Sequence, residues 1–239
     1  MRMNPKNVLL PYLRQLKSAH RFSSASLYFA ASEIAAQSNP DSFLGKEHSE
    51  LEALLKKEDG PDAEVVSYFV AQLFVGRIAS FEVFLQDTIY EVVKVHPKKV
   101  GKVKFDLSDI LDAPGVPELV QHAADFTINR LMYLKPLEYL AGVCDLLSID
   151  ATRLVSDWPL FVEAKARRDL GMHNDWRCNS IYERKVKEAG LECAFRAGES
   201  TAPRKEYVTN VGHSLTKLAE LITRMTMEKH WPEYASAVK

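Results

Sequence analysis

Apolar residues recur every three or four positions along most of this chain, which is the spacing of one face of an α-helix. The longest such pattern runs from residue 62 to about residue 95, and its apolar stripe contains Phe74, Ile78, Phe81, Leu85, Ile89 and Val92. Alternating apolar and polar residues, which are typical of half-buried strands, do not form a convincing set anywhere in the sequence. The pattern therefore predicts an all-α protein.

Turn-forming residues divide this pattern and indicate one domain boundary. Gly60 and Pro61 interrupt the periodicity in KKEDGPDAE, so we expect a helical extension over residues 1–60 and a main domain over residues 61–239. The predicted helices span about 6–20, 24–37 and 42–57 in the extension, and about 62–95, 117–131, 136–147, 157–173 and 205–229 in the domain. Ser156 or Asp157 is expected to cap the helix that begins near residue 157. The stretch 176–203 is less regular and is expected to hold a small hairpin at most.

Composition narrows the class of protein. The chain has 239 residues, 46% hydrophobic and 26% charged, with a formal net charge of -1, so a folded core is expected and any anion-binding site must be local. Three scattered cysteines do not make a disulfide framework and favour a reducing, cytoplasmic setting. The N-terminal apolar run is too short for a secretory signal, and no segment approaches the length of a membrane span.

The stretch RRDLGMHNDW, residues 167–176, gathers charged and polar residues where an apolar helix is expected to end. Arg168 and His173 are five residues apart, so on a regular helix they point about 140° away from each other. Three arrangements can bring them to one target. The helix unwinds at Gly171, or the long arginine side chain reaches around the helix end, or Arg168 of one chain meets His173 of a second chain across a two-fold axis.

An arginine and a histidine together suit the chemistry of a phosphodiester. The guanidinium is a planar fork of donors that matches phosphate oxygens, and an imidazole can take or give a proton near neutral pH. The sequence has no HExxH motif and no closely spaced His/Cys set, so no metal or other cofactor is expected. On spacing alone, the simpler interpretation is that Arg167 and Arg168 stabilise a helix C-terminus and that His173 is a surface residue.

These residues match a known signature. The segment ARRDLGMHNDW resembles the Arg-x4-6-His signature of the HEPN superfamily, in which an arginine, a polar residue and three others precede His-Asn. The segment FVGRIASFEVFLQDTIYEVVKVHP is similar to the first long helix of bacterial HEPN proteins encoded near antiphage and toxin loci. The resemblance covers residues 65 to 231, and it implies a HEPN-like helical bundle, here with an N-terminal helical extension, that forms a homodimer through its motif helices.

The resemblance also implies an activity. It is that of a metal-independent endoribonuclease that cleaves RNA, tRNA included, by attack of the 2′-OH, with Arg168 and His173 as the catalytic residues. Asp169 and Asn174 would orient His173 or contact RNA. Such proteins are toxic effectors of bacterial defence or toxin–antitoxin systems, so an antitoxin or defence-system partner is expected. The alternative is a non-catalytic HEPN scaffold or a nucleotide- or RNA-binding module, which would not need both Arg168 and His173.

Two positions depart from the family pattern. HEPN toxins that are paired with a nucleotidyltransferase antitoxin carry a tyrosine two residues after the histidine, and this chain has Asp175 there. Control by modification of that tyrosine is therefore not expected. Gly171 stands where an aliphatic residue is common, so the helix geometry at this point is left open.

Other candidate residues have two interpretations each. Glu82 lies at the edge of the long apolar stripe, where it is either half-solvated or the partner of Arg168. Arg167 satisfies the looser spacing of the signature and can support the site. Tyr182 and Asn179, which follow the motif, can line an RNA groove, although packing is the more common role of such a tyrosine. The lysines at 98, 99, 102 and 104 either follow a phosphate backbone or form a solvated connector.

Overall fold

The computed structural model describes Lys46 and residues 61–233, so the predicted extension over residues 1–60 lies almost wholly outside the described part. The described helices are α4 (Pro61–Val95), η2 (Pro97–Val100), α5 (Leu107–Asp112), α6 (Val116–Met132), α7 (Pro136–Leu147), η3 (Ala151–Arg153), α8 (Trp158–His173), α9 (Ser180–Glu188) and α10 (Lys205–His230). No strand occurs among the described residues, and a single isolated antiparallel bridge joins Arg177 to Ser200. The predicted all-α class is confirmed for this part of the chain.

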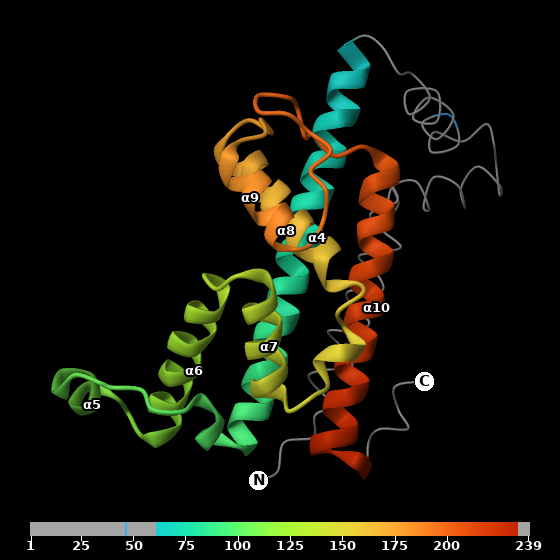
Figure 1. The fold of residues 1–239 in the computed structure, drawn as a ribbon. Helices are drawn as coiled ribbons and strands as arrows, with labels where there is room; N and C mark the ends of the chain where they lie inside the picture. The colour runs from blue at the N-terminus through green and yellow to red at the C-terminus, as the bar shows by residue number, and fades with distance from the viewer. Residues whose placement is uncertain (1–45, 47–60, 234–239) are drawn as a thin grey trace.

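Two long helices, α4 and α10, lie side by side, and the other helices pack around them (Figure 1). Helix α8 contacts α4, α10, α7 and α9, so the helix that carries the 167–176 stretch lies at the centre of the fold. Helices α6 and α7 pack against each other and against α4. This arrangement fixes the orientation of α8 on several sides.

The core forms where the apolar stripe of α4 meets α8. All six stripe residues predicted from the sequence are buried: Phe74, Ile78, Phe81, Leu85, Ile89 and Val92. The rings of Phe81 and Phe161 of α8 are 4.8 Å apart, and Trp158 stacks edge-on against Phe161 at 5.0 Å. The prediction that Trp158 packs the start of the motif helix is confirmed, because its side chain is buried and its indole N–H donates to the Pro136 carbonyl.

Helix α8 begins close to the predicted position but without the predicted cap. Asp157 occupies the N-cap, yet its side chain makes no capping hydrogen bond to the backbone. Its carboxylate instead accepts a hydrogen bond from Ser156 and pairs with Lys217 of α10. A tertiary ion pair has thus replaced a local cap, and Pro159 in the first turn suits the start of the helix.

Helix α8 continues through Gly171 to His173, so the arrangement in which it unwinds at Gly171 is wrong. The chain then reverses through Asp175 and Trp176, whose φ angles of 47° and 57° are left-handed. This turn folds the Trp176 indole back over the helix, where a Cβ on residue 171 would lie 2.3 Å from the ring. Glycine at 171 is therefore required by the close approach of Trp176 and not by helix unwinding.

The stretch 176–203 contains a helix that the sequence pattern did not predict. Helix α9 begins after Asn179, whose side-chain oxygen accepts hydrogen bonds from the backbone N–H groups of Ile181 and Tyr182. Its buried face consists of Tyr182 and Val186, which are four residues apart. The expectation of a small hairpin at most is therefore wrong, because one strong N-cap and a two-residue apolar face are enough when α8 packs against them.

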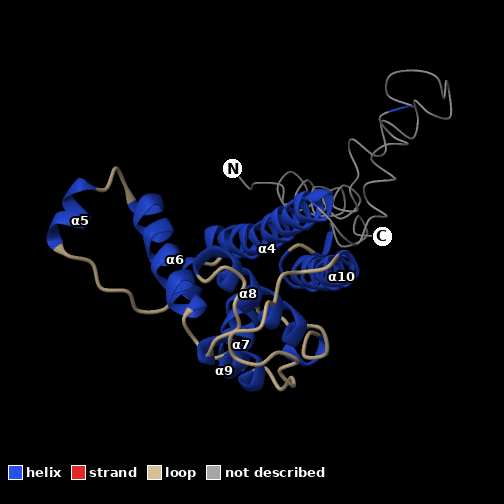
Figure 2. Cartoon of the chain, turned by 90° about the horizontal axis from the view of Figure 1, so that it is seen from above, coloured by secondary structure: helices blue, strands red, loops and turns tan. Residues whose placement is uncertain are grey.

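Helix α5 stands away from the rest of the fold on the connector between α4 and α6 (Figure 2). None of its residues is buried, and Leu107, Ile110 and Leu111 are exposed. None of the described helices combines the length and the apolar character that crossing a bilayer requires.

Candidate functional site

The two adjacent arginines of the motif lie on different sides of α8, because successive helical residues are rotated by about 100°. Arg167 faces the interior and is 9% exposed, whereas the side chain of Arg168 is 18% exposed and lies toward α4. Arg168 is therefore the motif arginine that a ligand can reach. Arg167, which was a candidate for supporting the site, is placed in the core.

Arg167 belongs to a buried network that ties three helices together. The Glu163 carboxylate accepts hydrogen bonds from Arg167 Nε at 2.7 Å, from the Tyr182 hydroxyl at 2.5 Å and from the Tyr207 hydroxyl. The Arg167 guanidinium lies over the Tyr207 ring, 3.8 Å from its centroid, and also over the ring of Phe195. Burial and the nearby Glu163 charge raise the pKa of both tyrosines, so their hydroxyls stay protonated and donate.

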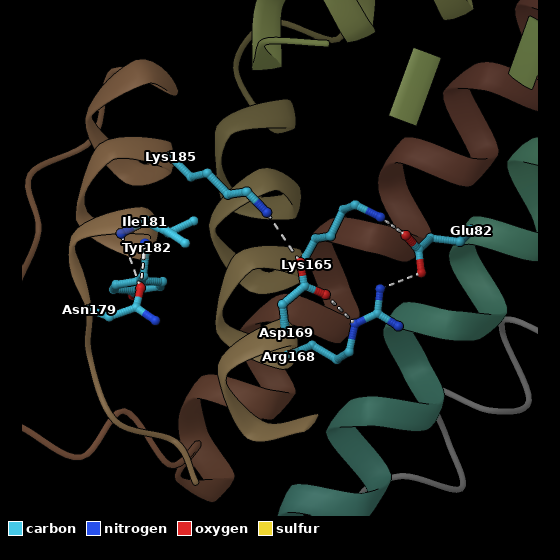
Figure 3. Close-up of polar contacts among 8 residues, drawn as sticks. All are labelled: Glu82, Lys165, Arg168, Asp169, Asn179, Ile181, Tyr182 and Lys185. Atoms are coloured by element: carbon cyan, nitrogen blue, oxygen red, sulfur yellow. Dashed lines mark hydrogen bonds and ion pairs between the residues drawn. The ribbon is translucent and has the colours of Figure 1, made fainter. Parts of the chain in front are cut away.

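Arg168 is held in place by two carboxylates (Figure 3). Its Nη2 donates to Glu82 Oε2 of α4 at 2.7 Å, which is the second of the two interpretations that the sequence left open for Glu82. Its Nε lies 3.1 Å from Asp169 Oδ1, within ion-pair distance but not aligned for a hydrogen bond. A guanidinium has five N–H donors, and the hydrogen bond to Glu82 uses one of them, so Arg168 keeps donors for a further anion.

The same carboxylates bind two lysines, which makes a continuous chain of charges across three helices. Lys165, one turn before Arg168 on α8, donates to the other oxygen of Glu82. Lys185 of α9 lies 3.2 Å from the second oxygen of Asp169 (Figure 3). Three cations therefore share two carboxylates in the order Lys165, Glu82, Arg168, Asp169 and Lys185. The cluster has a net positive charge and lies partly open to solvent.

His173 ends α8 with its side chain exposed and with no partner among the described residues. Neither residue expected to orient it does so through a hydrogen bond. Asp169 is engaged by Arg168 and Lys185, and the Asn174 amide donates to the Arg177 carbonyl at 2.6 Å. His173 is free to meet a ligand or a second chain, and Asn174 stabilises the turn that follows it.

The remaining sequence candidates have structural positions. Tyr182 is buried in the Glu163 network, and the side chain of Asn179 caps α9. Neither side chain is therefore placed to contact RNA. Of the four connector lysines, Lys99 bonds to the Asp145 carbonyl and to Ser148, while the other three are exposed. The connector interpretation therefore fits Lys99, and the exposed lysines remain open to either role.

Sequence reasoning missed Lys165, Lys185 and Glu163. Lys165 carried a weak signal, because a lysine three residues before Arg168 lies on the same face of a helix. Lys185 carried none, because the helix that holds it was not predicted. Glu163 lies four residues before Arg167, which is the spacing of a helical ion pair, and that signal was available.

No protein-family model matches this sequence, and no curated protein or solved structure shows significant similarity to the chain. Within residues 61–233, no group of three or more His, Cys, Asp or Glu side chains is placed to hold a metal ion. Arg168 and His173 are therefore the residues of the described part that point to a function.

Proposed function

We propose that this protein is a metal-independent endoribonuclease of HEPN type that acts as the toxic effector of a bacterial defence or toxin–antitoxin system. The observation that carries the proposal is the contrast between the two motif residues. Arg168 is a partly exposed cation positioned by Glu82 and Asp169, whereas His173 is exposed and unpartnered within the described residues. A positioned guanidinium and a free imidazole are the two groups that cleavage of a phosphodiester by its own 2′-OH requires.

The proposed active site is composite. Arg168 and His173 lie on one regular helix, where five residues correspond to a rise of about 7.5 Å and a rotation of about 140°. One chain would direct both side chains at one phosphate only if Arg168 reached around the helix end, and its guanidinium is instead held against Glu82 of α4. In the proposed two-fold dimer, the exposed end of α8, with Met172 56% exposed beside His173, faces its copy, and Arg168 of one protomer meets His173 of its partner.

The proposed chemistry needs only these two side chains and the substrate. His173 takes the proton from the 2′-OH, and the 2′-oxygen forms a bond to phosphorus while the bond from phosphorus to the 5′-oxygen breaks. The leaving 5′-oxygen takes a proton from water, which gives a 2′,3′-cyclic phosphate and a free 5′-OH. Arg168 stabilises the negative charge that develops on the phosphoryl oxygens.

The first experiment incubates the purified chain with total RNA and tRNA in EDTA and identifies the ends of the products. Cleavage that persists in EDTA and leaves cyclic phosphate and 5′-OH ends is expected, and RNA with a 2′-O-methyl group at the scissile nucleotide should resist. His173→Ala and Arg168→Ala should each lose activity, while Asp175→Asn, which suits the left-handed backbone there, should retain it. Products with 5′-phosphate ends would contradict the mechanism.

Mixing two inactive variants tests the composite site. A heterodimer of Arg168→Ala and His173→Ala has one site that lacks both residues and one that is intact. Random exchange of protomers should therefore restore about a quarter of the wild-type activity, because half of the dimers are mixed and each has one working site of two. If the active site lay within one chain, mixing would restore nothing.

One observation favours the second candidate function, a nucleotide- or RNA-binding module without cleavage. Arg168 is engaged by both Glu82 and Asp169, and such pairing stabilises a fixed guanidinium without any reaction. This module would bind RNA in EDTA and leave it intact, and His173→Ala would bind as well as the wild type. The first experiment therefore separates the two candidates.

A further inference from the structure

A groove of about 350 Å³ opens beside the charged cluster, between the α6–α7 turn, α8 and α9. Its volume lies in the range of small-molecule sites. Its charged lining consists of four cations and one carboxylate: Lys135, Lys165, Arg184, Lys185 and Glu188. The excess of positive charge indicates an anionic ligand.

Two of these cations are free to bind a ligand. Lys135 and Arg184 are exposed, and neither has an ion pair or a side-chain hydrogen bond within residues 61–233. Lys185 has a partner in Asp169, but its side chain is 39% exposed and its ammonium has further N–H donors for a ligand. These three residues present one guanidinium and two ammonium groups, which suit phosphate oxygens.

The groove also has an apolar wall that a purely ionic ligand would not use. Tyr133 is 91% exposed, Leu134 is 44% exposed, and Val162 lies deeper between the helices. Nucleic-acid bases stack on solvent-exposed aromatic rings, and nearby cations neutralise the phosphates. Tyr133 and the cations of the groove have this arrangement. A phosphate group and a flat apolar ring together describe a nucleotide.

The groove is continuous with the motif residues. Lys185 of the groove wall contacts Asp169, which contacts Arg168, and Lys165 shares Glu82 with Arg168 (Figure 3). We propose that this groove binds one nucleoside phosphate, with the phosphate on Lys135, Arg184 and Lys185 and the base against Tyr133. If the proposed function holds, on which this placement of substrate rests, the bound unit is the nucleotide of the RNA strand next to the one that is cleaved.

The test measures binding of the full chain in a His173→Ala background, so that cleavage does not consume the probe. The probes are a fluorescein-labelled single-stranded RNA of ten nucleotides, with adenosine monophosphate and poly-glutamate as competitors. Lys135→Ala/Arg184→Ala should weaken RNA binding roughly tenfold. The slope of log K against the logarithm of the salt concentration should become shallower by about 0.7 for each phosphate contact that is lost. Tyr133→Leu should weaken binding about fivefold or more at every salt concentration, because stacking is not ionic.

A matched control removes two cations from outside the groove. Arg224→Ala/Lys229→Ala changes an arginine and a lysine that are exposed on α10, which does not line the groove, and should leave RNA binding within about twofold of the parent. Equal losses in the control and in the groove variant, or no loss in either, would overturn the inference. Competition by poly-glutamate that does not depend on Tyr133 would also overturn it, because the groove would then take acidic polypeptides.

The remaining outcomes separate this inference from the proposed ribonuclease. If adenosine monophosphate displaces the labelled RNA at a concentration similar to that of the RNA, the ligand is a free nucleotide. If the ten-nucleotide strand binds more tightly than adenosine monophosphate, the ligand is RNA. If the wild type does not cleave RNA but the groove variants lose binding, only the ribonuclease fails. If the wild type cleaves RNA and the groove variants bind and cleave normally, only the groove assignment fails.

Discussion

Neighbouring residues in the motif differ in accessibility because a helix turns between them. Arg167 is enclosed by Tyr207, Phe195 and Glu163, whereas Arg168 projects toward α4 and keeps free donors. Helix rotation alone separates an arginine that stabilises the core from one that can act on a ligand. The same geometry predicts different consequences for an arginine-to-alanine change at these two positions.

Gly171 gives a prediction at the scale of one residue. A methyl group at this position would lie 2.3 Å from the Trp176 ring, which is held by the left-handed backbone at Trp176 and by two hydrogen bonds from Thr201 to its carbonyl. Gly171→Ala should therefore lower the free energy of unfolding by about 1 to 3 kcal/mol, the usual range for overpacking. Urea unfolding followed by tryptophan fluorescence measures this change.

The control for Gly171 is Gly76, an exposed glycine of α4 with open space around it. Nothing lies within 4 Å of a Cβ at Gly76 of α4, so Gly76→Ala should stabilise the protein by about 0.5 to 1 kcal/mol through helix propensity. Equal effects of the two substitutions would contradict the proposed contact with Trp176.

At the scale of elements, α8 is the helix to which the others are fixed. It packs through Trp158 and Phe161 near its start, and Glu163, two residues further on, joins it to α9 and α10. The short helix α9 lies beside the charged cluster because Tyr182 connects it to Glu163. The position of Lys185, and with it one wall of the groove, therefore depends on a buried carboxylate that does not line the groove.

Glu163→Gln tests this dependence. The substitution removes the charge that faces the buried Arg167 and should lower the free energy of unfolding by about 3 kcal/mol, because breaking one side of a buried ion pair leaves the other charge uncompensated. Lys217→Ala breaks the more exposed pair with Asp157 and should cost less than about 1 kcal/mol. Urea unfolding of both variants compares the two, and similar losses would refute the difference.

At the scale of the whole molecule, a cluster of basic residues joins the ends of three helices. His230 at the end of α10 lies 5.0 Å from the His96 ring after α4, and its Nε2 bonds to the Leu147 carbonyl at the end of α7. Burial lowers the pKa of His230, the hydrogen bond to Leu147 opposes this, and the positive charges of His96, Lys99 and Lys229 lower it further. The folded protein therefore favours the neutral imidazole, with Nε2 as the donor.

This cluster makes stability depend on pH in a defined window. An unfolded histidine has a pKa of about 6.5, so below this pH the unfolded chain binds a proton that the folded protein resists. The free energy of unfolding should decrease as the pH falls below about 6.5, until the lower pKa of folded His230 is reached. Urea midpoints between pH 5 and pH 8 measure this decrease.

His230→Gln should flatten this part of the pH dependence, since glutamine keeps a donor for Leu147 and does not titrate. His122→Gln is the matched control, because His122 is exposed on α6 and should not change the profile. A wild-type slope that survives in His230→Gln would show that another group is responsible.

The sequence by itself determined the features that are written within a few turns of chain. The stripe from Phe74 to Val92 predicted α4, and prolines and apolar spacing predicted α6, α7, α8 and α10, because helix periodicity depends on residues three and four positions apart. The same local rule showed that Arg168 and His173 diverge, which follows from helix geometry alone. Glu82 was also found, as a carboxylate at the edge of an apolar stripe.

Only the tertiary structure decided which residues meet across elements. Glu82 and Arg168 are 86 positions apart, and their contact depends on how α4 and α8 cross. Lys185 reaches Asp169 only because α9 forms, and α9 was missed because its buried face has just two apolar residues and its stability depends on packing against α8. Packing between elements also decides that Asp157 pairs with Lys217 and does not cap α8. The same is true of Trp176, which packs over Gly171. Local periodicity fixes the axis and face of each helix, whereas the partners of a charged side chain are set by packing between helices, which no spacing in the sequence records.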